Sequence, residues 1–361
     1  MSELTEKPNK PAIDQPVQAR SEESPNIERL NSYLQSQGFE IGQVLSVLQF
    51  PSGYSNLTFC LNTASGEYIL RRPPIGANIK SAHDMGREFK VLTLLKKYYP
   101  IVPTPIAYCD TDEIIGSPFY VMERLQGVVL RAGNASKLGI TPQQFKSVSE
   151  SLVDNFVKLH DLDIQSTGLD QLGKPDGYVQ RQVEGWSKRY FTAATDDITE
   201  MNLLADWLQK NQPISQSPTF LHNDYKYDNV ILDPQNLSTI MGVLDWEMST
   251  VGDPLMDVGA SIAYWSEAGD DPILQSFNLT ALAGNLTRKQ FIDRYAEKSK
   301  RDISNILFYY AFGLFKNAVI AQQIYTRWKQ GLTKDARFGG LLMVIKALAK
   351  QGVNSLNKGT V

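Results

Sequence analysis

Three polar residues in the second half of the chain have the types and spacing that phosphoryl transfer requires. The stretch FLHNDYKYDNVILD places Asp224 and Asn229 in a loop between two apolar runs, and Asp245 follows in GVLDWE. An amide oxygen and a carboxylate make a poor zinc site but suit Mg²⁺, which takes its remaining ligands from water and phosphates. Asp224 would then be free to accept a proton from a hydroxyl group, which is the division of roles in phosphoryl transfer. In the structural alternative, Asp224 and Asp228 cap turns and Asn229 bonds to backbone, but the combined pattern favours the functional interpretation.

A predicted β-hairpin brings the two expected metal ligands together. VILD and IMGVLD have the character of two short strands, and the NLST region between them is typical of a turn. The hairpin would carry Asn229 and Asp245 to the same end. His222 has the chemistry of a base, but Asp224 already fills that position. We therefore expect His222 to bond to the loop backbone and to the region before Asp245.

The segment GDPLMDVG is interpreted as support for this loop. Asp253 precedes Pro254 and is expected to cap the helix that Pro254 begins. Asp257 lies one helical turn further on and is expected to brace the catalytic loop.

Two other groups of residues could contact phosphates. Ser52, Gly53 and Ser55 lie in a turn between two predicted strands, where small residues let backbone N–H groups approach an anion. Taken alone they favour an ordinary hairpin turn, because both GxGxxG and the Walker A pattern are absent from the sequence. Arg71 ends a predicted strand, and Glu88 lies on the next predicted helix. An ion pair between them would aim the arginine at phosphates, and an ordinary surface salt bridge fits the two residues equally well.

The elements that must position these residues fall into a β-rich part and a helical part. Periodicity and turn residues predict the following elements of the first part: a helix over residues 27–38, strands in VLSVLQF, NLTFCLNT and EYILRR, a helix over residues 87–99, and strands near residues 106–108 and 119–125. Beyond Gly127 the chain is predicted to be mainly helical, with the polar loop at residues 222–229 and a last helical block over residues 288–352. We therefore predict a bilobal α+β fold with a disordered tail over residues 1–25, an N-terminal lobe over 26–125 and a C-terminal lobe over 126–361.

Composition narrows the classes of function. The chain has 361 residues, 42% of them hydrophobic, and a formal net charge of −3, which argues against a dedicated nucleic-acid binder. Cys60 and Cys109 are wrongly spaced for zinc and too few for a disulfide framework, so two buried reduced thiols in a cytoplasmic protein are expected. The most apolar run, residues 303–321, contains polar residues and is predicted to be a buried helix, not a membrane span.

With these motifs in place, the chain resembles the aminoglycoside phosphotransferase family, which has the protein-kinase-like fold. HNDYKYDN resembles that family's H-G-D-x-x-x-x-N loop, and LDWE stands where the family has its metal-binding segment. SGYSNLTF, YILRRPP, FYVMERLQG and DWEMSTVGDPLMDVG look like the branch whose phosphotransferase domain is fused to acyl-CoA dehydrogenases. The resemblance implies ATP between the lobes, Mg²⁺ on Asn229 and Asp245, and Asp224 as the base. It also implies phosphate contacts from Ser55 with its neighbour Asn56, and adenine bonded to backbone at Met122, Glu123 and Arg124.

The sequence departs from the protein kinases at several of these positions. Arg71 stands where many kinases have a lysine, and its planar, permanently charged group can grip phosphates with two hydrogen bonds. The phosphate loop lacks the protein-kinase glycines. Trp246 replaces the mobile phenylalanine of Asp-Phe-Gly, so switching by that residue cannot be assumed here.

The acceptor is expected to be a hydroxyl of a small molecule, and a hydroxy acid or a hydroxyacyl-CoA is the first hypothesis. The cations Lys174, Arg181, Lys188 and Arg189, in GKPDGYVQRQVEGWSKRY, favour an anionic acceptor, although solvated surface charges would have the same pattern. The alternatives are a kinase of choline or homoserine, an aminoglycoside kinase, a protein kinase, and a nucleotide-binding module without activity. We expect a monomer or a homodimer without nucleic-acid or membrane partners.

Overall fold

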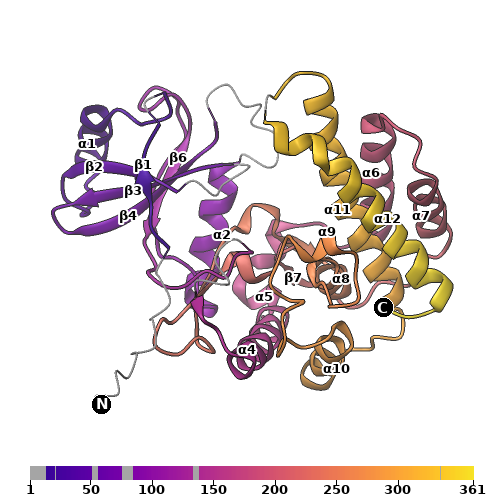
Figure 1. The fold of residues 1–361 in the computed structure, drawn as a ribbon. Helices are drawn as coiled ribbons and strands as arrows, with labels where there is room; N and C mark the ends of the chain where they lie inside the picture. Colours follow the sequence, from indigo (N-terminus) through magenta and orange to yellow (C-terminus); the bar gives the residue numbers. More distant parts are fainter. Residues whose placement is uncertain (1–13, 21, 51–55, 75–83, 133–137, 334) are drawn as a thin grey trace, which may run out of the picture.

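The computed structural model describes residues 14–20, 22–50, 56–74, 84–132, 138–333 and 335–361. A β-rich lobe and a helical lobe lie side by side (Figure 1). The helices α11 (Ile306–Lys329) and α12 (Leu341–Lys358) pack against each other and run diagonally through the helical lobe. This arrangement confirms the predicted bilobal α+β architecture.

The N-terminal lobe is a six-stranded antiparallel sheet in the order β1-β2-β3-β4-β6-β5. Its strands are β1 (Val17–Gln18), β2 (Val44–Gln49), β3 (Leu57–Thr63), β4 (Gly66–Arg72), β5 (Pro105–Cys109) and β6 (Phe119–Glu123). Helix α1 (Ile27–Ser36) is capped by Asn26, and α2 (Met85–Tyr98) is capped by Asp84. Asparagine and aspartate at these positions accept a hydrogen bond from an otherwise unpaired N–H of the first turn.

The two helices of this lobe cover opposite faces of the sheet. Side chains alternate along a strand, so Phe59 and Leu61 pack in one apolar cluster with Leu30 of α1. Cys60, between them in β3, belongs to the other cluster, which contains Leu92 of α2. This sandwich fixes the position of α2 and therefore of every side chain that α2 directs towards the helical lobe.

The start of the ordered structure differs from the prediction. Residues 14–20 are described, and β1 pairs with β2, with Val17 opposite Gln49. The Asp14 N–H donates to Gly127 O (3.2 Å), and the Arg131 guanidinium pairs with the Asp14 carboxylate (2.8 Å). The prediction of a disordered tail up to residue 25 is therefore wrong for this segment, because backbone pairing and one ion pair hold a polar stretch that has little apolar surface to bury. We call residues 14–20 the N-terminal strap.

The C-terminal lobe is built on a bundle of helices. Its other regular elements are α4 (Pro142–His160), α5 (Ile164–Thr167), α6 (Tyr178–Ala193), α7 (Thr199–Lys210), α8 (Pro254–Tyr264), α9 (Pro272–Gln275) and α10 (Arg288–Ser299), with short 3₁₀ turns at Leu169–Leu172, Tyr227–Asn229, Trp246–Met248 and Ala336–Gly340. Helix α11 packs against α8, α12 and α6. Most of the predicted apolar run, from residue 306 to 321, lies within this buried helix. In the part of the chain that the structure describes, no helix combines the length and apolar character needed to cross a bilayer.

Two glycines let α8 and α11 approach closely. A Cβ on Gly259 would lie 2.2 Å from the carbonyl oxygen of Tyr309, and one on Gly313 would lie 2.3 Å from the carbonyl oxygen of Gly259. Neither position can therefore hold a larger side chain without moving a helix. This close approach sets how deeply α11 lies behind the polar loops.

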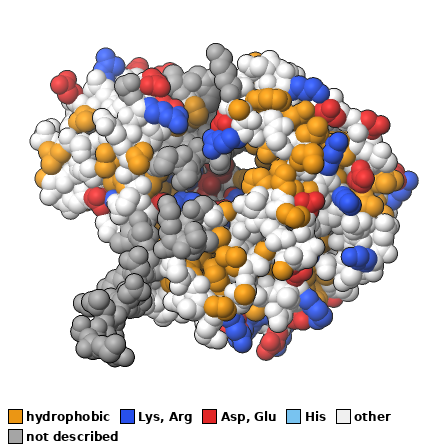
Figure 2. Space-filling model, in the orientation of Figure 1, with side chains coloured by type: hydrophobic (Ala, Val, Ile, Leu, Met, Phe, Trp, Pro, Cys, Tyr) orange, Lys and Arg blue, Asp and Glu red, His pale blue; other side chains and the backbone are white. Residues whose placement is uncertain are grey.

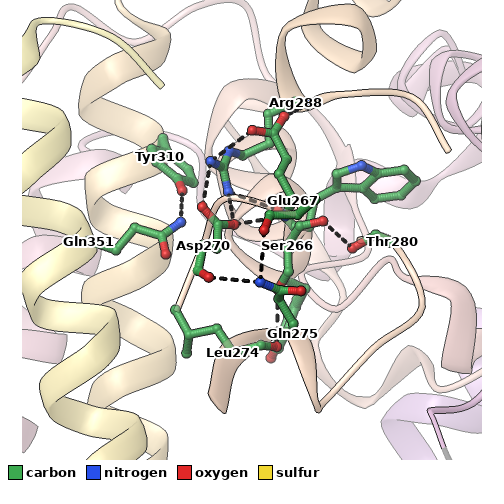
Figure 3. A network of polar contacts seen from close by, with 12 residues as sticks. Ser266, Glu267, Asp270, Leu274, Gln275, Thr280, Arg288, Tyr310 and Gln351 are labelled. Carbon is green, nitrogen blue, oxygen red and sulfur yellow. Dashed lines mark hydrogen bonds and ion pairs between the residues drawn. The ribbon is translucent and has the colours of Figure 1, made fainter. Parts of the chain in front are cut away.

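The segment between α8 and α10 is held by one buried arginine (Figure 3). Arg288 donates to both oxygens of Asp270 (2.5 and 3.0 Å), to Glu267 (3.1 Å) and to the carbonyl of Trp265 (3.1 Å). We call these four residues the Arg288 cluster. It fixes an irregular stretch that has little regular secondary structure of its own.

Two small antiparallel strand pairs flank the loops that carry Asp224 and Asp245. β7 (Thr219–Leu221) pairs with β10 (Thr250–Gly252), and β8 (Val230–Leu232) pairs with β9 (Ile240–Val243), all antiparallel. The β8–β9 pair is the predicted hairpin. Cys60 and Cys109 are buried free thiols, as predicted.

Candidate active site

A cleft of about 1970 Å³ separates the two lobes. The surface is visibly hollowed there (Figure 2). The N-terminal lobe lines it with residues of β3, β4, α2 and β6, and the C-terminal lobe lines it with the polar loops and with α6 and α11. Asp224, Asn229 and Asp245, which the sequence singled out, all line the cleft.

The loop that carries Asp224 is fixed through its backbone. The buried Asp257 of α8 accepts hydrogen bonds from the N–H groups of His222 (2.5 Å) and Asn223 (2.8 Å). His222 contacts the carbonyl of Leu244 through Nε2 (2.8 Å), and its Nδ1 accepts from the Asp224 N–H (3.2 Å). The predicted structural roles of His222 and Asp257 are therefore confirmed.

Asn223 occupies the left-handed region of backbone conformation, at φ 65°. Asparagine tolerates this region better than most residues, and its side chain donates to the carbonyl of Met248 (3.0 Å). The turn directs the next side chain, Asp224, into the cleft. Asp253 caps α8 by accepting from the Leu255 N–H (2.9 Å), as predicted.

Asp224 is an ionised carboxylate held between two donors. Lys226 Nζ lies 2.8 and 3.0 Å from its two oxygens, and Asn229 Nδ2 donates to Asp224 Oδ2 at 2.8 Å. Burial by itself raises the pKa of Asp224, but the charge and hydrogen bond of Lys226, and then the charge of Lys316, lower that pKa below its ordinary value. A carboxylate in this state can accept a proton from a hydroxyl placed beside it.

Asn229 and Asp245 lie at the same end of the β8–β9 hairpin. The Leu244 N–H donates to Asn229 O (2.8 Å), which joins the residue before Asp245 to Asn229. Asn229 Nδ2 is turned to the carbonyl oxygen and the carboxylate of Asp224 (2.8 Å each), so its Oδ1 points the other way. One amide oxygen and one carboxylate are a donor set suited to Mg²⁺ that is completed by phosphate and water. Within the described residues, no group of three or more His, Cys, Asp or Glu side chains could hold a metal, so a metal here would need such outside ligands.

The predicted pair of Arg71 and Glu88 is present and buried. Arg71 Nη1 lies 2.5 Å from Glu88 Oε1, and Arg71 Nη2 lies 3.2 Å from Asp245 Oδ1 and 3.7 Å from Glu247 Oε2. Burial opposes the charge on Arg71, but the Glu88 carboxylate raises the pKa of Arg71 well above its ordinary value. Asn56 donates to Glu247 Oε2 (2.8 Å) and so links the start of β3 to the same group. A buried network of this kind, and not a surface salt bridge, holds the cation over the end of the hairpin that carries Asn229 and Asp245.

The remaining predicted nucleotide contacts are only partly described. Ser52, Gly53 and Ser55 lie outside the described residues. Met122, Glu123 and Arg124 line the cleft at the end of β6. The Glu123 N–H donates to Thr104 O (2.9 Å), so an adenine at this position would use other backbone groups.

The side chains of Glu123 and Arg124 already bind other groups of the protein. Glu123 accepts from the Thr104 hydroxyl (2.6 Å). Arg124 pairs with Glu67 (2.8 Å) and donates to the carbonyl of Asp14 (3.2 Å). Arg124 therefore holds the strap, and any contact with a nucleotide would come from its backbone.

Three cleft residues were not singled out from the sequence. Lys226 lies two residues after Asp224, Glu247 ends the Asp-Trp-Glu segment, and Lys316 is the cation in the apolar run that forms α11. A lysine in an otherwise apolar helix was a visible signal for Lys316, since charged residues are almost never fully buried without a partner. For Lys226 the signal was its position inside the catalytic loop.

A β-rich lobe, a helical lobe and a fixed carboxylate in the cleft between them define a phosphotransferase with the protein-kinase-like fold. A family model described as the phosphotransferase enzyme family matches residues 46–291. The chain belongs to this family, and it has the character of a small-molecule kinase. This confirms the resemblance predicted from the motifs.

Relatives and solved structures agree with this assignment. Acyl-CoA dehydrogenase family member 11 of Rattus norvegicus is 38% identical over 306 residues, covering 84% of this chain and 39% of that protein. A solved Ralstonia eutropha structure, of a protein assigned to the aminoglycoside phosphotransferases, is 29% identical, with a TM-score of 0.78, over 93% of this chain and 99% of that one. The GDP and kanamycin complex of APH(2")-IIia is 13% identical, with a TM-score of 0.61, over 89% and 98% of the two chains, and shows the fold alone. The chain thus spans about two fifths of the length of the rat relative.

Proposed function

We propose that the protein transfers the γ-phosphoryl group of ATP to a hydroxyl of a small molecule, with Mg²⁺. The observation that carries this proposal is the ionised Asp224 carboxylate, held by Lys226 and by Asn229 at the same end of the hairpin as Asp245. The GDP complex among the structural neighbours supports nucleotide binding by the fold.

Each residue then has a separate task. Asp224 accepts or orients the proton of the acceptor hydroxyl, and Asn229 and Asp245 hold Mg²⁺, which neutralises charge on the phosphates when bound. Arg71, oriented by the buried Glu88, contacts phosphate oxygens, and the turn around Ser55 and Asn56 covers them. Most of the rate acceleration comes from positioning and from charges fixed before the reaction begins.

The acceptor proposed is a hydroxy acid or a hydroxyacyl-CoA. Of the four cations named from the sequence, Lys174, Arg181 and Arg189 line the cleft, whereas Lys188 does not. Such a wall repels positive charge, so it disfavours choline, which carries one cation, and even more an aminoglycoside, which carries several. It attracts an acceptor with a carboxylate or phosphate groups.

The test is ADP release by the purified full chain with ATP or GTP and Mg²⁺, against hydroxy acids, hydroxyacyl-CoAs, choline, homoserine and kanamycin. We expect one of the first two classes to stimulate ADP release. Stimulation only by choline, homoserine or kanamycin would keep the kinase but overturn the acceptor. Nucleotide binding without turnover on any compound would support a non-catalytic module.

The matched variants are Asp224→Asn and Asp233→Asn. Asp224→Asn should lower kcat by about 10²- to 10⁴-fold, the usual contribution of a positioned base, while nucleotide affinity changes little. Asp233 follows β8 outside the cleft lining and accepts from the Gln235 N–H (2.7 Å), so its variant should retain near-normal turnover. Equal losses in the two variants would remove Asp224 from the reaction.

A further inference from the structure

The cleft contains a buried lysine that the reaction proposed above does not use. Lys316 lies on α11, is 4% exposed and lines the cleft. Its neighbours Phe315 and Asn317 are also buried, so the side chain is surrounded on its own helix by packed residues. Burying an ammonium group costs free energy unless a partner compensates the charge.

Lys316 makes few bonds for a buried cation. Its Nζ donates to the carbonyl oxygen of Asn223 at 2.8 Å, and within the described residues this is the single hydrogen bond assigned to it. An ammonium group has three N–H donors. The other N–H donors of Lys316 Nζ are therefore at the wall of the cleft, next to Asn223, the residue before Asp224.

The surroundings of Lys316 favour an anion. Two cations lie near the indole of Trp186, on α6, with Arg189 Cζ 4.5 Å and Lys316 Nζ 5.8 Å from the ring centroid. The charged side chains that α6 and α11 contribute to the cleft are Arg181, Arg189, Lys316 and Arg327, and neither helix contributes a carboxylate. A group that enters between α6 and α11 therefore meets positive charge before it reaches Asp224.

The face of α11 also has a defined polarity. Phe312, Lys316, Ile320 and Ile324 recur at a spacing of four, which places them on one side of the helix, and all four line the cleft. Lys316 is thus a single deep cation on an apolar wall. Such a wall suits a short hydrocarbon segment with one polar end.

We propose that Lys316, with Arg189 nearby, binds a carboxyl oxygen of the acceptor while the acceptor hydroxyl lies at Asp224. The group bound is the carboxylate of a free hydroxy acid or the carbonyl of a hydroxyacyl thioester, since both present an oxygen to the ammonium donors. Lys316 is then a specificity-determining residue of the acceptor site. This inference rests on the phosphotransferase function proposed above.

A competing role is purely structural. Lys316 could act only through its bond to Asn223 O, by holding the loop in place. In that case its loss would lower turnover of every acceptor equally. The two roles are separated by acceptors that differ only in the carboxyl group.

The experiment compares kcat/KM of the wild type, Lys316→Met and Lys316→Arg on matched acceptors. The acceptors are 3-hydroxybutyrate, 4-hydroxybutyrate and 5-hydroxypentanoate, their CoA thioesters, and diols of the same chain lengths. We expect Lys316→Met to lower kcat/KM for acids or thioesters at least about tenfold, the size of a lost hydrogen bond to a charged group, with less than about a twofold change for diols. Lys316→Arg should restore part of the loss. If Lys316→Met lowers kcat/KM for the acids, the acceptor is a free hydroxy acid; if it lowers kcat/KM for the thioesters, the acceptor is a hydroxyacyl-CoA. An equal loss of kcat/KM for the diols would overturn the proposal.

A binding measurement keeps the two proposals distinguishable. Calorimetric titration with butyrate and with butyryl-CoA, in the presence of a non-hydrolysable ATP analogue, needs no turnover. Lys329→Met is the control, because Lys329 lies on the same helix outside the cleft lining and pairs with Asp196. If the wild type binds butyrate or butyryl-CoA, Lys316→Met abolishes this binding and no acceptor stimulates ADP release, the subsite is retained and the kinase is refuted. If hydroxy acids or their thioesters stimulate ADP release and Lys316→Met leaves this rate unchanged, the subsite is refuted and the kinase is retained. The absence of any binding of butyrate or butyryl-CoA would also refute the subsite.

Discussion

At the scale of single residues, the site depends on a carboxylate whose charge is set by its neighbours. The Asp224 side chain is only 16% exposed, and this partial burial favours its neutral form, yet Lys226 is close enough to reverse that preference. Burial opposes the charge on Lys226, but Tyr264 and then the Asp224 carboxylate raise the pKa of Lys226 above its ordinary value. The pair therefore favours the ionised form of Asp224 that the proposed reaction needs.

Replacing Lys226 by Met should move the acid limb of the pH–rate profile to higher pH. Asp224 must be ionised to accept a proton, and Lys226 is the main group that lowers its pKa. Without it, burial raises that pKa, so activity should be lost at a higher pH as the solution is acidified. The measurement is kcat/KM against pH with a hydroxy acid or thioester. Lys226→Arg should keep the wild-type limb, and an unmoved limb in Lys226→Met would show that another group sets it.

Lys316 should add an alkaline limb that depends on the acceptor. Burial, and then the nearby cations Lys226 and Arg189, outweigh the carboxylates of Asp224 and Asp257 and lower the pKa of Lys316 to about 8. The protonated form binds the carboxyl oxygen, so this form is present below pH 8 and lost above it. We expect kcat/KM for the acids or thioesters to fall as the pH rises through about 8, without a comparable fall for diols. A limb shared by all acceptors would assign the titration to another group.

The sequence predicted most of these residues because their signals are local. Asp224, Asn229 and Asp245 are joined by a hairpin whose strands were recognisable, and Arg71 and Glu88 lie on consecutive elements. Lys316 was missed as a site residue because its partner is a backbone oxygen far away in the sequence. Local patterns carry no information about such a partner.

At the scale of elements, the Arg288 cluster shows how an irregular segment is stabilised. Arg288 is 7% exposed, and its two Nη groups donate to two carboxylates and a carbonyl (Figure 3). Removing one partner of a buried ion pair leaves the other charge uncompensated. Without Arg288, the carboxylates of Asp270 and Glu267 would lose the charge that compensates them, which would destabilise the fold.

Replacing Arg288 by Met should lower the free energy of unfolding by about 3 kcal/mol or more, as for other broken buried pairs. Urea unfolding followed by circular dichroism gives this value. The control is Lys289→Met, because Lys289 is 82% exposed in its pair with Asp293 and exposed pairs contribute about 1 kcal/mol at most. Similar changes in both variants would show that the cluster contributes little.

Helices and hairpins were predicted well, and short pairings were not. The helix over 87–99 and the hairpin of β8 and β9 have clear periodicity and turn residues, and both occur near the expected positions. β1 has two residues and β10 has three, and their partners are distant in the sequence. Strands of this length are defined by backbone hydrogen bonds, which any side chain permits.

At the scale of the whole molecule, the proposed reaction needs residues from both lobes to meet across the cleft. Arg71 and Glu88 come from the sheet lobe, whereas Asp224, Asn229 and Asp245 come from the helical lobe. The ion pair of Arg71 with Asp245 (3.2 Å) and the hydrogen bond of Asn56 to Glu247 (2.8 Å) cross this boundary. The order of elements predicted two lobes, but it could not predict which side chains would meet between them.

The N-terminal strap gives the lobes a second connection besides the chain that follows β6. Its strand β1 belongs to the sheet, and Asp14 bonds to Gly127 and Arg131 at the start of the helical lobe. If the cleft opens far enough to separate these contacts, the ion pair between Asp14 and Arg131 must break. Its side chains are about one third exposed, and dissolved salt screens such pairs. The residence time of a nucleotide should therefore depend on ionic strength.

In stopped-flow displacement of a fluorescent nucleotide, Asp14→Asn should release it about two- to fivefold faster at low salt, the range expected for a pair of this exposure. High salt should bring the wild type to the same rate, whereas the surface variant Asp206→Asn, which loses an exposed pair with Lys210, should behave as the wild type. Equal rates for Asp14→Asn and wild type at low salt would mean that the lobes separate without the strap. If the expected rates are found, the segment before the first helix sets how long each product nucleotide stays, and so how fast the cleft can be reused.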